Sequence, residues 1–254
     1  MAHARHAGRR GRLPVKPPGE RFPIQYLGAY LTQPLPAPQY PVDVSGGITD
    51  WGMLGNGPDP ACTSHPNGVG DCTFAGRQHY KMAKANAYGE APPTESSDQL
   101  VAEYLQYDQG QDQGANIADL LLSWYQAGKI AAFAPVDHTS RAECDSAMAA
   151  FHGLYVGVNL TPNADQLFEQ GQPWALNGVQ PDPREGHCIV KVKADTGSDA
   201  WVTWGGLQAS STDWTAACLE EAWVIITSED VSATENIDIQ QLQSDINALH
   251  GTGS

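Results

Sequence analysis

The sequence lacks long apolar runs, paired cysteines and a surplus of basic residues. No stretch of its 254 residues approaches the roughly 18 apolar side chains of a membrane-spanning helix. The first residues lack the apolar stretch that follows the basic start of a signal peptide. Membrane insertion and classical secretion are therefore not expected. The five cysteines are odd in number and form no Cys-x-x-Cys pair, which excludes a complete disulfide framework and favours free thiols.

A recognisable metal motif is also missing. Cys62, His65, Cys72 and His79 carry side chains that bind zinc, but their irregular spacing matches no zinc knuckle. We therefore expect neither a metal nor a cofactor.

Charge is placed unevenly along the chain. Asp and Glu number 29 against 14 Lys and Arg, which gives a net charge of -15. Removing the +5 of the first 21 residues, where Glu20 is the only acid, leaves -20 for the rest. Six basic residues lie in this short segment: Arg5, Arg9, Arg10, Arg12, Lys16 and Arg21. Three interpretations stay open: a solubility tail, an arm that binds nucleic acid, and an arm that docks on an acidic protein such as another copy.

Composition divides the chain into an arm, a body and a tail. Ten of the 18 prolines lie in residues 1–60 and predict an extended arm over residues 1–41. The body over 42–228 is expected to have a helical half, about 70–152, and a sheet half, about 153–228. Within 229–254, apolar residues at helical spacing predict a tail helix that packs on the body or on another copy: Ile239, Leu242, Ile246 and Leu249.

Apolar periodicity indicates which elements build the two halves. It predicts helices over 72–88, 97–107, 117–126 and 142–151, and strands over 153–160, 188–194, 200–204 and 221–227. Helices that precede strands favour an α+β fold, with a helical half and an antiparallel sheet half that meet at a cleft.

Two residues stand at the edges of this expected cleft. Cys72 opens the first body helix, where unpaired amides and the helix dipole favour a thiolate. His187 opens the first clear strand after the loop over 162–186, and an imidazole facing a thiol can take its proton and so activate it as a nucleophile. The plainer alternatives are a buried small hydrophobe for Cys72 and a structural histidine for His187.

Three sequence blocks in this order resemble those of the papain-like cysteine peptidases. They are Gly70-Asp71-Cys72-Thr73-Phe74-Ala75, Gly186-His187-Cys188-Ile189 and Trp201-Val202-Thr203-Trp204-Gly205. Over about residues 45–227 the chain is most similar to uncharacterised papain-fold proteins of actinobacteria and their bacteriophages. The resemblance implies a papain-like fold and catalytic positions at Cys72 and His187. It also implies a cleft that includes Asp71, Gly186, Thr203 and Trp204.

Two positions depart from that family's pattern. Six residues before the cysteine, where the family has a glutamine that binds the oxyanion, this chain has Pro66, so Asn67 or Asn56 would have to donate instead. Val202 replaces the asparagine that orients the histidine, and the period of two predicts that Thr203 points to the opposite strand face. Such a dyad is slow, is assisted by another residue such as Asp195, or is inert.

Two functions fit these observations. The missing glutamine and orienting residue, the long arm and the resemblance to phage proteins favour a structural component of a bacteriophage capsid, connector or tail. That protein would dock on protein partners through its basic arm, would have weak or no catalysis, and would belong to the virion after assembly in the host cytoplasm. The alternative is an active cytoplasmic cysteine hydrolase that cleaves amide or ester bonds with Cys72 and His187.

Overall fold

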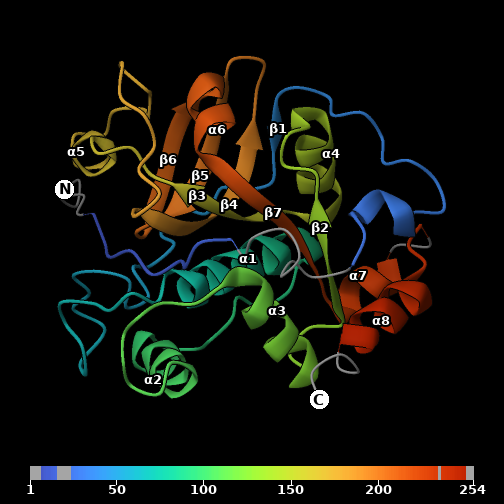
Figure 1. Cartoon of the computed structure of the whole chain (residues 1–254), viewed down its shortest axis with the longest axis horizontal. Helices are drawn as coiled ribbons and strands as arrows, with labels where there is room; N and C mark the ends of the chain where they lie inside the picture. Colours follow the sequence, from blue (N-terminus) through green and yellow to red (C-terminus); the bar gives the residue numbers. More distant parts are fainter. Residues whose placement is uncertain (1–6, 16–23, 234–235, 250–254) are drawn as a thin grey trace.

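An antiparallel sheet forms the centre of the molecule (Figure 1). The structure is a computed structural model that describes residues 7–15, 24–233 and 236–249. In the described residues the sheet has the strand order β2-β7-β3-β4-β5-β6, and β1 pairs with β4. The strands are β1 (Val42–Asp43), β2 (Ala132–Val136), β3 (Leu154–Asn159), β4 (Gly186–Ala194), β5 (Ser198–Thr203), β6 (Gly206–Ser211) and β7 (Leu219–Ile226).

Helices cover the sheet, and three of them form a layer below it in Figure 1: α1 (Cys72–Tyr88), α2 (Ser97–Tyr107) and α3 (Ile117–Gln126). The others are α4 (Arg141–Phe151), α5 (Ala164–Glu169), α6 (Thr212–Cys218), α7 (Ser228–Ala233), α8 (Ile239–Ala248) and a short 3-10 helix, η1 (Leu27–Tyr30). None of the helices in the described residues is both long and apolar enough to cross a membrane. The expected combination of a helical half and an antiparallel sheet half is confirmed.

Local signals explain why the first helices begin and end where they do. Ser96 forms a capping box with Gln99 at the start of α2. Gly89 ends α1 in the left-handed region with φ of 68°, which glycine adopts without steric cost. These caps make the helix ends readable from the sequence.

Besides the two-residue β1, two strands were not predicted. β2 lies inside the expected helical half and pairs with β7 at one edge of the sheet, where Pro135 is tolerated because an edge strand can leave one side unpaired. β6 forms the other edge and pairs with β5. Its sequence, Gly206 to Ser211, is rich in small polar residues and so has little strand propensity of its own.

The tail helix packs on the chain's own body. Leu242 and Ile246 of α8 are fully buried, and α8 lies against β2 and η1. The hydroxyl of Tyr30 in η1 donates to Asp245 Oδ2 at 2.8 Å. In this structure the tail helix therefore packs on the body, as the first of the two interpretations of the tail predicted.

Candidate active site

Cys72 occupies the first position of α1. The carbonyl of Asp71 accepts hydrogen bonds from the amides of Phe74 and Ala75 at 2.7 and 3.0 Å, so the helix begins at Cys72. The first turn itself contains no acidic residue, but the carboxyl of Asp71 at the N-cap position raises the pKa of the thiol and so opposes the helix dipole. The backbone N–H of Cys188 donates to Cys72 Sγ at 3.4 Å, which joins the start of α1 to β4.

His187 is the second residue of β4 and pairs with Val158 of β3. Its Nε2 lies 2.8 Å from Thr203 Oγ1, and its ring lies against that of Trp204 with centroids 4.9 Å apart. Its Nδ1 is buried and has no hydrogen-bond partner in the described part of the chain. The imidazole is thus held at one nitrogen while the other keeps its capacity for a further partner.

The expectation that Thr203 points away from His187 is wrong. The period of two applies to a regular strand, but Thr203 is the last residue of β5, and Trp204 after it has φ of 45°. The pairing of β4 with β5 is also irregular between Lys191 and Lys193, and such bulges re-aim side chains. Val202 is fully buried and pairs with Val190.

The two asparagines considered as oxyanion donors lie in different environments. Asn67 is exposed in the loop before α1. Asn56 is buried, and its Nδ2 lies 3.2 Å from the carbonyl oxygen of Arg9 and 3.3 Å from that of Val69. Asn56 is therefore the one of the two whose amide donates to the carbonyl of a segment lying in the cleft.

That segment is residues 7–15, called here the arm segment. Figure 1 shows its dark blue trace between the helical layer and the strands. Its backbone bonds to both sides of the cleft, because Arg12 N donates to the carbonyl of Gly186 at 3.3 Å and Ala115 N donates to that of Gly11 at 2.7 Å. Cys72 and His187 are each only 1% exposed beneath this cover.

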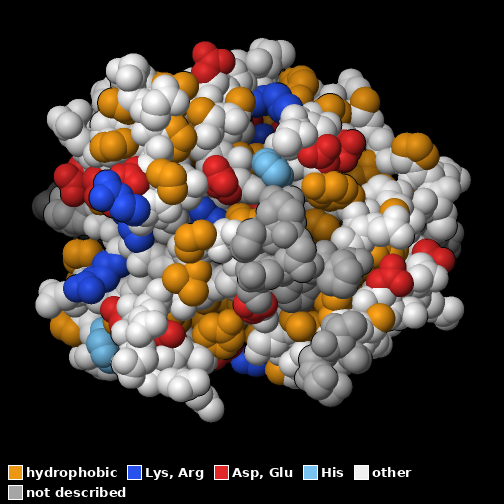
Figure 2. Space-filling view, in the orientation of Figure 1, with side chains coloured by type: hydrophobic (Ala, Val, Ile, Leu, Met, Phe, Trp, Pro, Cys, Tyr) orange, Lys and Arg blue, Asp and Glu red, His pale blue; other side chains and the backbone are white. Residues whose placement is uncertain are grey.

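The arginines of the arm segment pair with carboxylates of the same chain. Arg9 lies 3.8 Å from Asp112, Arg10 lies 3.0 Å from Glu185 and also bonds to Asp165, and Arg12 lies 3.1 Å from Glu221. Blue and red side chains are correspondingly interspersed on the face in Figure 2. Arg5, Lys16 and Arg21 fall outside the described residues. The described arginines of the arm segment thus pair with acidic side chains of the same chain. None of the three interpretations of the arm included such pairing.

Burial under the arm segment sets the protonation of the site. Burial raises the pKa of the Cys72 thiol to about 12. Burial also lowers the pKa of His187 well below its ordinary value, and the positive charges of Arg10 and Arg12 act in the same direction. The covered cleft therefore holds Cys72 as a protonated thiol and His187 as a neutral imidazole, whereas the sequence led us to expect a thiolate.

Two further residues were named from the sequence, Asp71 as part of the cleft and Asp195 as an assisting residue. Asp71 is fully buried, and burial raises the pKa of its carboxyl well above the usual range. Asp195 follows β4 at the end opposite His187, and its carboxylate accepts a bond from Thr196 N. All five cysteines are buried and free. Within the described ranges, no group of three or more His, Cys, Asp or Glu side chains could hold a metal ion.

Comparisons with known proteins identify the architecture. No protein-family model and no curated protein matches the sequence. Among solved structures, the chain is similar to xylellain, a cysteine protease from Xylella fastidiosa, with a TM-score of 0.57 and 13% identity over 89% of this chain and 99% of that one. It is also similar to digestive procathepsin L 3 of the Tenebrio molitor larval midgut, with a TM-score of 0.50 and 11% identity over 88% of this chain and 76% of that one. The chain therefore has the papain-like fold.

Proposed function

We propose that the chain is a papain-like cysteine hydrolase of amide or ester bonds whose cleft is covered by its own arm segment. The observation that carries this proposal is the contact between His187 Nε2 and Thr203 Oγ1, which leaves a buried Nδ1 without a partner among the described residues. A purely structural histidine in such a place would be expected to use both nitrogens. Cys72, at the start of α1, accepts a hydrogen bond from the backbone N–H of Cys188, the residue that follows His187 in β4.

The chemistry follows from this arrangement. Neutral His187, with the proton on Nε2 donated to Thr203, has a lone pair on Nδ1 that takes the proton of the Cys72 thiol. Sγ attacks the carbonyl carbon, and the carbonyl electron pair moves to oxygen. The C–N or C–O bond then breaks, and the leaving group takes the proton from Nδ1. Water that loses a proton to Nδ1 hydrolyses the thioester, and the proton returns to sulfur.

Two donors are proposed for the oxyanion. The backbone N–H of Cys72 is at the first position of α1, where no carbonyl of the helix can accept its hydrogen bond. The second is Asn56 Nδ2, which in the covered state donates to the carbonyl of Arg9. A donor already directed at a peptide carbonyl in the cleft suits the carbonyl of a substrate, whose oxygen gains negative charge during attack.

Turnover requires that the arm segment leave the cleft. While it is bound, the Cys72 thiol has a pKa of about 12 and the backbone acceptors at Gly186 and Ala115 are occupied. A substrate must compete for the same groups. The enzyme is therefore inactive while the arm segment covers the cleft.

The structural role in a phage particle, which the sequence favoured, has less support. Thr203 supplies the histidine partner that Val202 could not, and the described arginines of the arm pair within the chain. The solved structures that resemble the chain carry the names of cysteine proteases, and nothing in the comparisons points to a virion. An assembly partner or nucleic acid for residues 1–41 stays a prediction.

The function can be tested by releasing the arm segment in the full-length chain. A Cβ at Gly11 would lie 1.6 Å from the carbonyl oxygen of Gly70, so we expect Gly11→Val to expel the segment. A library of fluorogenic peptidyl amides and the matching esters should contain substrates hydrolysed at least about 10-fold faster by this variant than by the unaltered chain. Gly197→Val is the matched control, because a Cβ there meets open space. A folded Gly11→Val chain without turnover above background would refute the hydrolase.

The role of Thr203 makes a separate prediction. In the Gly11→Val chain, Thr203→Val keeps the side-chain shape but leaves the buried His187 Nε2 without its partner, and we expect kcat to fall by about 10- to 100-fold with little change in KM. Thr203→Ser should restore most of the loss because it returns the hydroxyl. Equal loss in the Thr203→Ser and Thr203→Val variants would indicate that packing, and not the hydrogen bond, matters at this position.

A further inference from the structure

The side chain of Arg12 is enclosed beside the candidate active site. It is 1% exposed, although arginine is seldom fully buried without a partner. Its Nη1 donates to Glu221 Oε1 at 3.1 Å, and its Nη2 donates to Asn159 Oδ1 at 2.5 Å and to the carbonyl of Val158 at 3.3 Å. These three acceptors come from β3 and β7, so they belong to the sheet and not to the arm.

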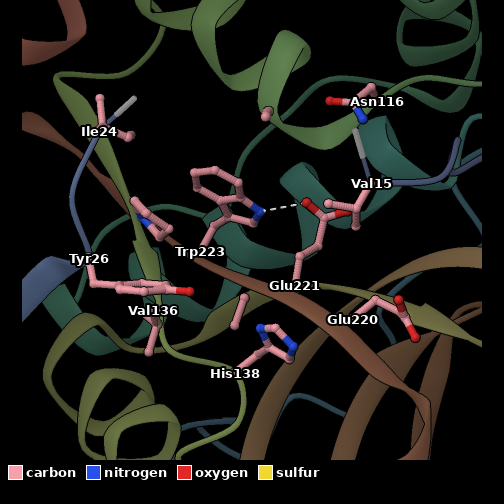
Figure 3. A pocket seen from close by; sticks show the side chains of 12 residues that line it. Val15, Ile24, Tyr26, Asn116, Val136, His138, Glu220, Glu221 and Trp223 are labelled. Atoms are coloured by element: carbon pink, nitrogen blue, oxygen red, sulfur yellow. Dashed lines mark hydrogen bonds between the residues drawn. The ribbon is translucent and has the colours of Figure 1, made fainter. Parts of the chain in front are cut away.

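The carboxylate of Glu221 is also held by a side chain of the sheet. Trp223 Nε1 donates to Glu221 Oε2 at 2.9 Å, as Figure 3 shows, which leaves Oε1 for Arg12. Glu221 and Trp223 also border a neighbouring cavity of about 230 Å³, whose lining does not include Arg12. Burial raises the pKa of Glu221, and the positive charge of Arg12 opposes that shift. A cation opposite this buried carboxyl therefore favours its charged form.

Glycines make the room that an arginine ligand needs. A Cβ at Gly157 would lie 2.6 Å from Arg12 Cδ, and a Cβ at Gly186 would lie 2.3 Å from the carbonyl oxygen of Arg12. On the ligand side, Gly11 passes so close to Gly70 that no other residue fits there. The backbone around Arg12 is held as in a sheet, because Leu13 N donates to the carbonyl of Ala115 at 2.9 Å.

We propose that this pocket is a guanidinium-binding specificity site, and that the ligands of the cleft are extended peptides in which arginine directly follows glycine. The arm segment fills the site with Gly11-Arg12 in the covered state. Glu221 and Asn159 read the guanidinium, and Gly70 excludes any side chain before it. Insofar as it names the substrate, the inference rests on the proposed hydrolase; as a binding site it stands by itself.

The test uses a full-length chain with an empty pocket and no chemistry. Gly11→Val and Arg12→Ala empty the cleft, and Cys72→Ala prevents cleavage. The probe is fluorescein-labelled Gly-Arg-Arg-Gly-Arg-Leu-amide, and binding is followed by fluorescence anisotropy. The matched control peptide has citrulline in place of the last arginine, which keeps the shape and removes the charge. We expect the citrulline peptide to bind at least about 30-fold more weakly. Glu221→Gln should abolish most of this difference.

Equal affinity for the two peptides, or no binding by a folded variant, would overturn the proposal. Because Cys72 is absent from this chain, an inactive enzyme cannot mimic either result. If the multiple variant does not fold, the otherwise unaltered chain gives a second measurement. Glu221→Gln should speed tryptic cleavage after Arg12 by at least about 10-fold relative to Glu220→Gln, because it weakens the contact that holds the arm segment. Equal cleavage rates would count against the pocket.

Discussion

Replacing Cys72 by alanine in the Gly11→Val chain is expected to lower turnover of the best substrate by about 10⁴-fold or more. The substitution removes the atom that forms the covalent intermediate, and losses of this size follow removal of a nucleophile or its base in hydrolases with a comparable catalytic unit. The measurement is the initial rate of release of the fluorescent group under saturating substrate, with kcat and KM determined separately.

Cys218→Ala provides the matched control for this experiment. Cys218 is likewise a buried, free cysteine, but it ends α6 and contributes no contact to the cleft described above. We expect the control to keep kcat within about twofold. Residual turnover of the Cys72→Ala chain close to that of the control would mean that hydrolysis uses another nucleophile.

Release of the arm segment should raise the rate at which iodoacetamide labels Cys72 at pH 7 by about 10³-fold. A thiol with a pKa of about 12 is almost entirely protonated at pH 7, whereas an ordinary exposed thiol is a few per cent thiolate, and only the thiolate reacts. Labelling can be followed residue by residue by mass spectrometry in the unaltered, Gly11→Val and Gly197→Val chains.

The pH dependence of the same reaction has a definite sign. In the unaltered chain the raised pKa makes labelling climb about tenfold per pH unit through pH 9 and beyond. In the Gly11→Val chain, Cys72 can give its proton to His187, so labelling should level off below the ordinary thiol pKa of about 8.5. A Gly11→Val chain that labels as slowly as the unaltered one would show that the arm segment is not what protects Cys72.

Much of the fold could be predicted because its signals are local. The helix over 72–88 has apolar residues at helical spacing and a glycine stop, and α1 has these bounds. β2 and β6 could not be predicted in the same way, because a proline and small polar residues hide edge strands whose formation depends on their neighbours.

The candidate site, too, could be predicted only where its signals are local. Cys72 and His187 carry short sequence blocks, but the choice between Asn56 and Asn67 depends on how an irregular loop folds. Thr203 was misplaced because alternation fails at the end of a strand. The pairing of Arg12 with Glu221 joins residues 209 positions apart, and no local pattern indicates such a contact.

The occupant of the cleft is attached to the body that it covers, and this tether changes how tightly it must bind. A ligand joined covalently to its own binding site experiences an effective concentration of about millimolar, so even a modest intrinsic affinity keeps the site filled. A single cut in the chain after Val15 would turn the same peptide into a free ligand at the concentration of the protein itself. At micromolar protein that is a dilution of about a thousandfold. One broken peptide bond, with no change in any contact of the cleft, would then suffice to empty it.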